Sequence, residues 1–177
     1  MLCIYPSLST LRLEVSGIEV TRTGSAFLRN FSNSSDRSEL VQRLGKVRPD
    51  SQPRWGSMSA HQMVCHLSDS FRAAMAEKYI SPASTPFKRT VMKWWALWAP
   101  LPWPHGVKTR PEMDQKIGGT PPEDFAVDVE ALRELMNRFC AWDKDYAPHA
   151  TLGPLSRQER MRHAYLHVNH HLRQFGT

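Results

Sequence analysis

The stretch SRQERMRHAYLHVNHHLRQFG, residues 156–176, decides the fold. Ser156 followed three residues later by Glu159 forms a capping box, in which each side chain satisfies a backbone N–H group of the other residue. Gly176 is a typical stop signal at the far end. The pattern therefore predicts a helix that begins after Ser156 and continues through Leu172.

Three more segments upstream carry apolar side chains at the three- and four-residue intervals of a helix. They cover about residues 37–45, 59–79 and 123–145. The first is predicted to be capped by Ser35 or Asp36, and the second begins with another capping box, formed by Ser59 and Gln62. Four amphipathic helices without a convincing central strand predict an all-α fold, a four-helix bundle.

A long connection, residues 82–124, separates the second and third of these main helices. It contains a predicted short aromatic helix, about residues 88–99, and the turn-rich sequence PLPWPHG. We interpret its tryptophans as packing of the core or of a lid, not as a platform for a ligand. Loops of this length in a compact domain usually shape a pocket or a lid, so we expect this connection to border a functional site.

The chain is predicted to divide into an N-terminal extension, residues 1–35, and a helical domain, residues 36–177. The extension contains the alternating sequence LRLEVSGIEVTR and then a Ser- and Asn-rich stretch. A strand and a flexible tail both remain open for it. A length of 177 residues fits one domain around a single core.

Composition and charge exclude several classes of protein. The formal net charge of +6 comes from 23 Lys and Arg against 17 acidic residues. The basic residues are dispersed and no nucleic-acid-binding motif occurs, so nucleic acid is not an expected partner. The longest apolar stretch, around residues 91–103, is too short to span a membrane. Cys3, Cys65 and Cys140 are widely separated, which is typical of reduced thiols, and we expect a soluble protein of the cytoplasm.

Histidines are concentrated in the last predicted helix, within the sequence HAYLHVNHH. His167 and His171 are four residues apart, so their side chains lie on one helix face, close enough to bind one metal ion. His163, four residues before His167, is an alternative to either member of this pair. His66 is the candidate for a third ligand, because the neighbouring Leu67 belongs to the apolar stripe of its helix.

Three neutral imidazoles suit zinc, nickel or a similar divalent ion and leave one coordination position open. An open position indicates catalysis. Asp69 lies one turn after His66 and is predicted either to orient a ligand imidazole or to act as a base. The alternative interpretation is a histidine-rich helix face without a metal, either solvated or hydrogen-bonded in the core.

The segments RWGSMSAHQMVCHLSDSFR and LSRQERMRHAYLHVNHHLRQFG resemble the DinB/YfiT-like superfamily. The resemblance is to a branch without assigned function that shares W-G-x-M, Q-M-x-x-H and a terminal H-x-x-H-H-L-R-Q-F, and it extends over about residues 36–176. It implies a four-helix bundle in which one histidine of the second helix and an H-x-x-x-H pair of the last helix hold a metal. Residue by residue, these ligands are His66, His167 and His171, and His163 has no counterpart.

Several members of that superfamily are thiol-dependent S-transferases, so the resemblance implies a metal-dependent enzyme that uses a low-molecular-weight thiol and a small-molecule substrate. The sequence agrees, because Val168 follows His167 and the glutamate base of an H-E-x-x-H protease is missing. The second hypothesis is a metal-dependent hydrolase of small esters or amides with Asp69 as its base. The third is a non-catalytic metal-binding or stress protein. A homodimer remains open.

Overall fold

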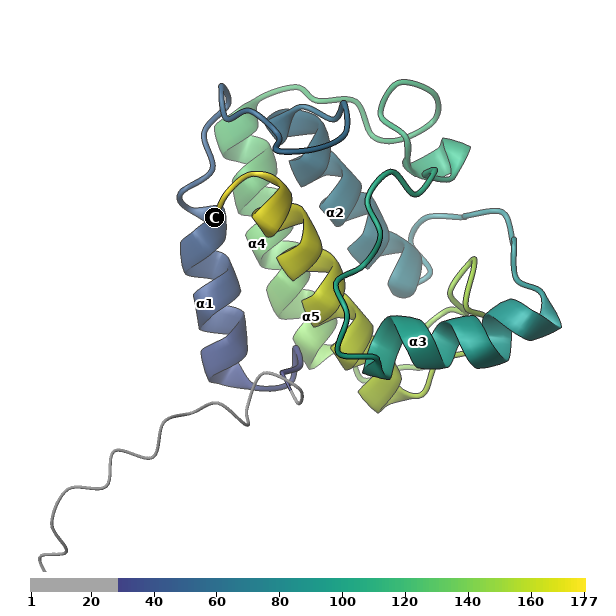
Figure 1. Cartoon of the computed structure of the whole chain (residues 1–177). Helices are drawn as coiled ribbons and strands as arrows, with labels where there is room; N and C mark the ends of the chain where they lie inside the picture. The colour runs from purple at the N-terminus through teal and green to yellow at the C-terminus, as the bar shows by residue number, and fades with distance from the viewer. Residues whose placement is uncertain (1–28) are drawn as a thin grey trace, which may run out of the picture.

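The computed structural model describes residues 29–177, which form five α-helices and no β-strand (Figure 1). The helices are α1 (Ser34–Leu44), α2 (Ala60–Ala74), α3 (Lys93–Trp98), α4 (Phe125–Ala141) and α5 (Arg157–Gln174). The predicted all-α class is confirmed for this part of the chain. None of these helices is long and apolar enough to cross a membrane.

The N-terminal extension is only partly within the described residues. Its strand or tail, together with Cys3, lies in residues 1–28 and so outside them. Phe31 is fully buried in the core, and its backbone N–H donates to the carbonyl of Met161 at 3.1 Å. The division into residues 1–35 and 36–177 stays a prediction.

Both predicted capping boxes are present. The hydroxyl of Ser59 accepts from the backbone of Gln62 while the Gln62 side chain accepts from the backbone of Ser59, and Ser156 and Glu159 pair in the same way. Gly176 adopts φ +81°, a left-handed conformation that is typical of the position just after a helix, here α5. The two helices that carry the candidate ligands therefore begin where the sequence predicts.

Other helix ends differ from the prediction. The cap of α1 is Asn33 and not Ser35 or Asp36, because the Asn33 side chain accepts the backbone N–H of Ser35 at 2.9 Å. Asp36 instead is buried and accepts the backbone N–H of Asn30 at 3.0 Å. The end of α2 comes before residue 79, because Ala76 takes a left-handed φ of 62° that no helix can continue.

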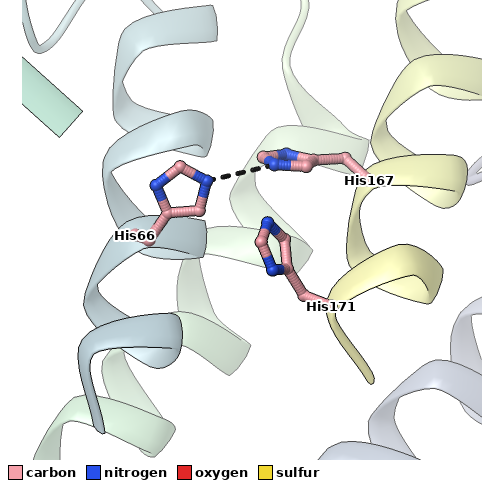
Figure 2. A group of neighbouring side chains, drawn as sticks. All are labelled: His66, His167 and His171. Carbon is pink, nitrogen blue, oxygen red and sulfur yellow. Dashed lines mark hydrogen bonds between the residues drawn. The ribbon is translucent and has the colours of Figure 1, made fainter. Parts of the chain in front are cut away.

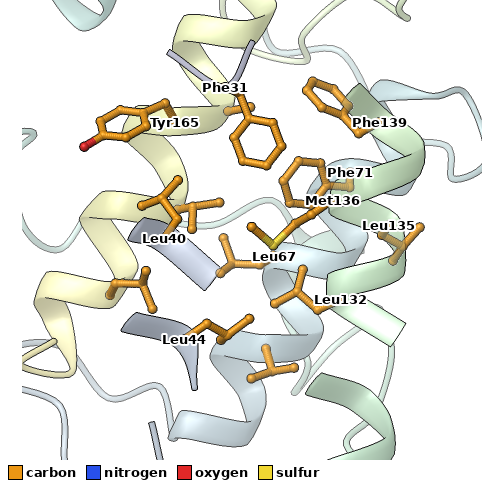
Figure 3. Packing of buried hydrophobic residues seen from close by; sticks show 14 of the residues in the cluster. Phe31, Leu40, Leu44, Leu67, Phe71, Leu132, Leu135, Met136, Phe139 and Tyr165 are labelled. Atoms are coloured by element: carbon orange, nitrogen blue, oxygen red, sulfur yellow. The ribbon is translucent and has the colours of Figure 1, made fainter. Parts of the chain in front are cut away.

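The main helices pack around one apolar core. In space, α2 lies against α4, and α5 contacts both α1 and α2. Three phenylalanine rings meet at one end of the core, with centroids 5.5 Å apart for Phe31 and Phe71 and 5.0 Å apart for Phe71 and Phe139 (Figure 3). Leu67 and Met136 continue the core from the facing sides of α2 and α4. This packing fixes α2 and α5 beside each other.

The connection between α2 and α4 lies on the side of α5 opposite to α1 (Figure 1). The predicted aromatic helix is present in two parts, a π-helical turn at Lys88–Met92 that runs into α3. A short 3-10 turn, Pro111–Met113, then contacts α2. The segment therefore reaches the histidines on both α2 and α5.

Candidate metal centre

Three histidines from two helices meet in one cluster (Figure 2). His66 comes from α2, and His167 and His171 come from successive turns of α5. The Nε2 atoms of His66 and His167 lie 3.2 Å apart. The ring of His171 lies 4.9 Å from each of the other two rings, measured between centroids. The structure thus brings together the three residues that the sequence singles out.

A separate acceptor faces the Nδ1 atom of two of these rings. Nδ1 of His66 lies 3.1 Å from the carbonyl oxygen of Met113, and Nδ1 of His171 lies 2.9 Å from Oε1 of Gln174. Both oxygens only accept hydrogen bonds, so each of these Nδ1 atoms carries the ring proton. Each Nε2 is then left with a free lone pair, as a metal ligand requires.

His167 is positioned by Ser70, whose hydroxyl oxygen lies 3.2 Å from Nδ1. A hydroxyl both donates and accepts, so it is compatible with a proton on Nδ1 of His167 as well. With that proton in place, the Nε2 lone pairs of His66 and His167 face each other across 3.2 Å. Two facing acceptors at this distance repel unless a cation lies between them. In the other tautomer of His167, Ser70 donates to Nδ1 and Nε2 of His167 donates to Nε2 of His66, which is the hydrogen bond drawn in Figure 2.

Burial keeps the cluster uncharged. Desolvation lowers the pKa of His66, although the hydrogen bond with Met113 and the charge of Asp69 partly oppose it. Desolvation, followed by the neighbouring imidazoles, holds the pKa of His167 and that of His171 well below the ordinary value. All three rings are therefore neutral near pH 7, and neutral imidazole is the form that binds metal.

The spacing fits a metal ion. Two nitrogens that each lie about 2.1 Å from one ion at a tetrahedral angle are about 3.4 Å from each other. The observed separation of 3.2 Å between His66 and His167 is close to this value, and the ligand atoms of all three residues lie within 4.8 Å of one another. The cluster could hold a metal ion with three protein ligands, which leaves room for one further ligand.

The three imidazoles open onto a cavity of about 1150 Å³. The connection supplies part of its wall, including Trp95 and Trp103. The ring of Trp103 lies 6.1 Å from that of His167, and its indole N–H donates to the carbonyl of Ala96 at 2.7 Å. Trp94, in contrast, is 62% exposed. The expectation that the connection borders the site is confirmed.

A family model described as "Protein of unknown function (DUF1569)" matches residues 29–177. The chain belongs to this family. The match includes the whole described part of the chain and therefore all three histidines. Comparisons with curated proteins and with solved structures return no match.

Asp69 is fully buried, but its oxygens face other groups than the imidazoles. It accepts from the hydroxyl of Thr120 at 2.6 Å and from the backbone N–H of the same residue at 2.9 Å. The ammonium of Lys78 lies 2.8 Å away. Its carboxylate raises the pKa of His66 through space, and its role as a base stays a prediction.

Sequence reasoning missed the orienting partners of the imidazoles. Met113 acts through a backbone carbonyl, which carries no sequence signal, and Ser70 and Gln174 are ordinary polar residues one turn from a ligand. Gln174 shows the best available signal, because residues three apart on a helix share a face. The alternative ligand His163 lies outside the cluster and contacts the ring of His149, at 4.5 Å between centroids.

A second group of potential metal ligands was also missed by sequence reasoning. His61 and Cys65 of α2 lie within 4.8 Å of Asp128 of α4. Nε2 of His61 is 2.6 Å from the Asp128 carboxylate, which also accepts from the Cys65 thiol at 3.6 Å. The signal for this pair was the four-residue spacing on α2.

Proposed function

We propose that His66, His167 and His171 bind a divalent ion, zinc or nickel, and that the protein is a metal-dependent enzyme that transfers a low-molecular-weight thiol to a small electrophile. One observation carries the proposal. The Nε2 atoms of His66 and His167 lie 3.2 Å apart in a buried, neutral cluster whose other nitrogens are held by separate partners. That arrangement offers nitrogen lone pairs to a cation when each ring carries its proton on Nδ1.

The arrangement of helices supports the same proposal. With α1, α2, α4 and α5 as its members, the fold is consistent with the four-helix bundle of the DinB/YfiT-like superfamily. The candidate ligands stand on the helices where that resemblance expects them, one on α2 and two on α5. We therefore carry the thiol-dependent chemistry of that superfamily over as a hypothesis for this chain.

A bound divalent ion would supply a Lewis acid that lowers the pKa of a thiol and so raises the fraction of thiolate at neutral pH. The residues of the chain prepare this chemistry. Gln174 and the carbonyl of Met113 fix two imidazoles in the tautomer that binds a cation. Trp103 supplies an apolar wall beside His167, with ring centroids 6.1 Å apart.

Thiol transfer fits the site better than hydrolysis does, because it needs no protein base. The oxygens of Asp69 are engaged by Thr120 and Lys78. A second carboxylate near His66, that of Asp114, accepts the backbone N–H of Lys116 at 2.9 Å. Both carboxylates therefore already have hydrogen-bond partners of their own in the structure. The cavity in turn favours an enzyme over a protein that only stores metal.

Metal analysis and a thiol-transfer assay test the proposal. After dialysis against zinc or nickel, the wild-type protein is expected to retain one ion per chain. With chlorodinitrobenzene as the electrophile, the thiol sulfur forms a C–S bond, the C–Cl bond breaks, chloride leaves with the electron pair, and the thiol proton passes to solvent. Faster release of product with the metal-loaded protein than without protein supports the transferase.

The His61→Ala variant is the matched control for removal of His66, because His61 also belongs to α2 but lies outside the cluster of His66, His167 and His171. It is expected to keep both metal and activity. Hydrolysis of nitrophenyl acetate without thiol, combined with no thiol transfer, would replace the transferase by the hydrolase hypothesis. Absence of bound metal from the wild-type protein would overturn the proposal as a whole.

A further inference from the structure

A buried arginine lines the same cavity and has no carboxylate partner among the described residues. Arg160 is only 4% exposed. Its guanidinium donates to the backbone carbonyl of Ala147, and its Nε has no hydrogen-bond partner within residues 29–177. No acidic side chain of this part of the chain lies within ion-pair distance of it. Desolvation lowers the pKa of Arg160 to about 10, and the group still carries its charge at pH 7.

A buried cation without a counter-ion lowers the stability of the folded state, so such a group is a candidate for part of a binding site. Lys78 shows the usual solution, because it lies 2.8 Å from the buried carboxylate of Asp69. Arg160 has no such neighbour within the described part of the chain and instead borders the cavity. The missing counter-ion is therefore expected to come from a ligand.

Arg160 and the candidate metal ligands share one face of α5. Arg160, His163, His167 and His171 follow each other at intervals of three and four residues, and all four side chains line the cavity. At a rise of about 1.5 Å per residue, Arg160 lies about 10 Å from His167 along the helix axis. The face thus presents a cation at one end and the histidine cluster at the other.

A second hydrogen-bond donor lies beside this arginine. Nδ1 of His149 accepts the backbone N–H groups of Thr151 and Leu152, at 3.2 and 3.1 Å, so the proton of the neutral ring is on Nε2. Burial, followed by the charge of Arg160, lowers the pKa of His149 to about 3. The ring of His149 lies 4.5 Å from that of His163, between centroids. One cation and neutral imidazoles therefore meet at this end.

The charge of the cavity wall agrees with an anionic ligand. Among residues 29–177, the acidic side chains of this wall amount to Asp114 alone, whereas the basic ones are Lys78, Arg89, Lys108, Arg110, Lys116 and Arg160. An electropositive, partly desolvated cleft attracts anions. Trp103 lies between the two ends, with its ring 5.4 Å from His163 and 6.1 Å from His167. The middle of the cavity can therefore receive an apolar segment.

We propose that Arg160, His149 and His163 form an anion-binding subsite that takes a carboxylate of the substrate. The inference rests on the proposed function in one respect, namely that the other end of the same molecule meets the metal. The substrate class is then a carboxylate joined through an apolar body to a thiol or to the group that reacts with one. Charge-assisted hydrogen bonds from a guanidinium give such a site its selectivity for the anion over a neutral analogue.

The test compares mercaptohexanoate with mercaptohexanol, which differ only in the carboxylate. Binding of each to the zinc-loaded full chain is measured by calorimetry. The carboxylate is expected to bind about tenfold tighter or more to the wild-type protein. In Arg160→Gln this ratio is expected to fall to about one, because Gln keeps a donor for Ala147 but carries no charge.

Arg162→Gln is the matched control. Arg162 is also buried on α5 and also donates to backbone carbonyls, those of Leu97 and Arg29, but it does not line the cavity. Its loss is expected to lower the melting temperature and to leave the preference for the carboxylate unchanged. A folded Arg160→Gln protein that keeps the full preference would overturn the subsite.

Hexanoate and hexanol, tested on the metal-free wild-type protein, separate the two proposals. If neither thiol binds in a zinc-dependent way but hexanoate still binds tighter than hexanol, the metal chemistry fails and the subsite stands. If both thiols bind equally well to the zinc-loaded protein, the subsite fails and the metal chemistry stands. If Arg160→Gln does not fold, NMR of the arginine side-chain N–H groups in the wild-type protein replaces it. We then expect an Arg Nε–H signal to shift when hexanoate is added and not when hexanol is added.

Discussion

Two groups of potential metal ligands each include residues of α2, and they differ in what their polar atoms already bind. In the first, His66 faces His167 across 3.2 Å, and the Nδ1 proton of His66 is already donated to a carbonyl. In the second, Nε2 of His61 lies 2.6 Å from a carboxylate oxygen of Asp128, so that a ring N–H faces a hydrogen-bond acceptor. Three ligand-type residues lie within 4.8 Å of one another in both groups, so proximity alone does not separate them.

The second group is complete without an ion. Asp128 accepts from His61, from the thiol of Cys65 and from the backbone N–H of Glu123. Burial and the neighbouring Asp128 raise the pKa of the Cys65 thiol to about 12, so the thiolate that a metal requires is scarce at pH 7. A metal site is therefore distinguished by unsatisfied lone pairs more than by residue type.

The largest expected effect is the loss of bound metal from His167→Ala. The variant removes one of the two facing Nε2 atoms and leaves only two protein ligands. Metal retained after dialysis, measured by mass spectrometry, is expected to fall from one ion per chain to background. His61→Ala is expected to retain the same amount of metal as the wild-type protein. If it loses as much metal as His167→Ala does, the assignment of the metal to the first group alone is wrong.

An intermediate effect is expected for Gln174→Ala. This side chain accepts the Nδ1 proton of His171 at 2.9 Å, and loss of such an orienting partner weakens metal binding by about 10- to 100-fold. Competition with a chelator of known affinity measures the change. Gln158→Ala, at an exposed position of α5, is the control and should leave the affinity unaltered. An affinity that Gln174→Ala does not change would show that the Gln174 contact has no part in holding the ligand.

The smallest effect is expected for Asp128→Asn in the second group. The half-buried pair with His61 is expected to contribute about 1 kcal/mol to the free energy of unfolding at pH 7, with no change in metal content. Burial opposes ionisation of Asp128, but hydrogen bonds from His61 and from the backbone of Glu123 lower its pKa overall. A carboxyl group with a lowered pKa stabilises the fold above its ordinary value of 3.8, and this stability is lost as the pH falls through the lowered value.

Urea unfolding of the wild-type protein and of Asp128→Asn at pH 7 and near pH 3 checks this dependence. The difference between the two proteins should shrink at the lower pH. Asp143→Asn, at an exposed position after α4, serves as the control with no expected change. A difference that grows on acidification would contradict the assignment of a lowered pKa.

Local signals fixed the elements that carry the site. The capping boxes of Ser59 and Ser156 set the start of α2 and α5 because each involves residues only three apart. The weaker cap of α1 was misplaced, since Asn33, Ser35 and Asp36 are all good capping residues and the choice between them depends on what Asp36 contacts. Spacing likewise predicted the His167 and His171 pair but left His163 as an alternative.

The sequence by itself determined that the described chain is helical, that two histidines share a face of its last helix, and through its motifs that His66 is the expected third member. Only the tertiary structure decided which lone pairs remain free. Met113 and Trp103 reach the histidines from a distant connection, and no carboxylate of residues 29–177 lies beside Arg160. Hydrogen-bond satisfaction depends on contacts between residues far apart in sequence, and no local pattern encodes it.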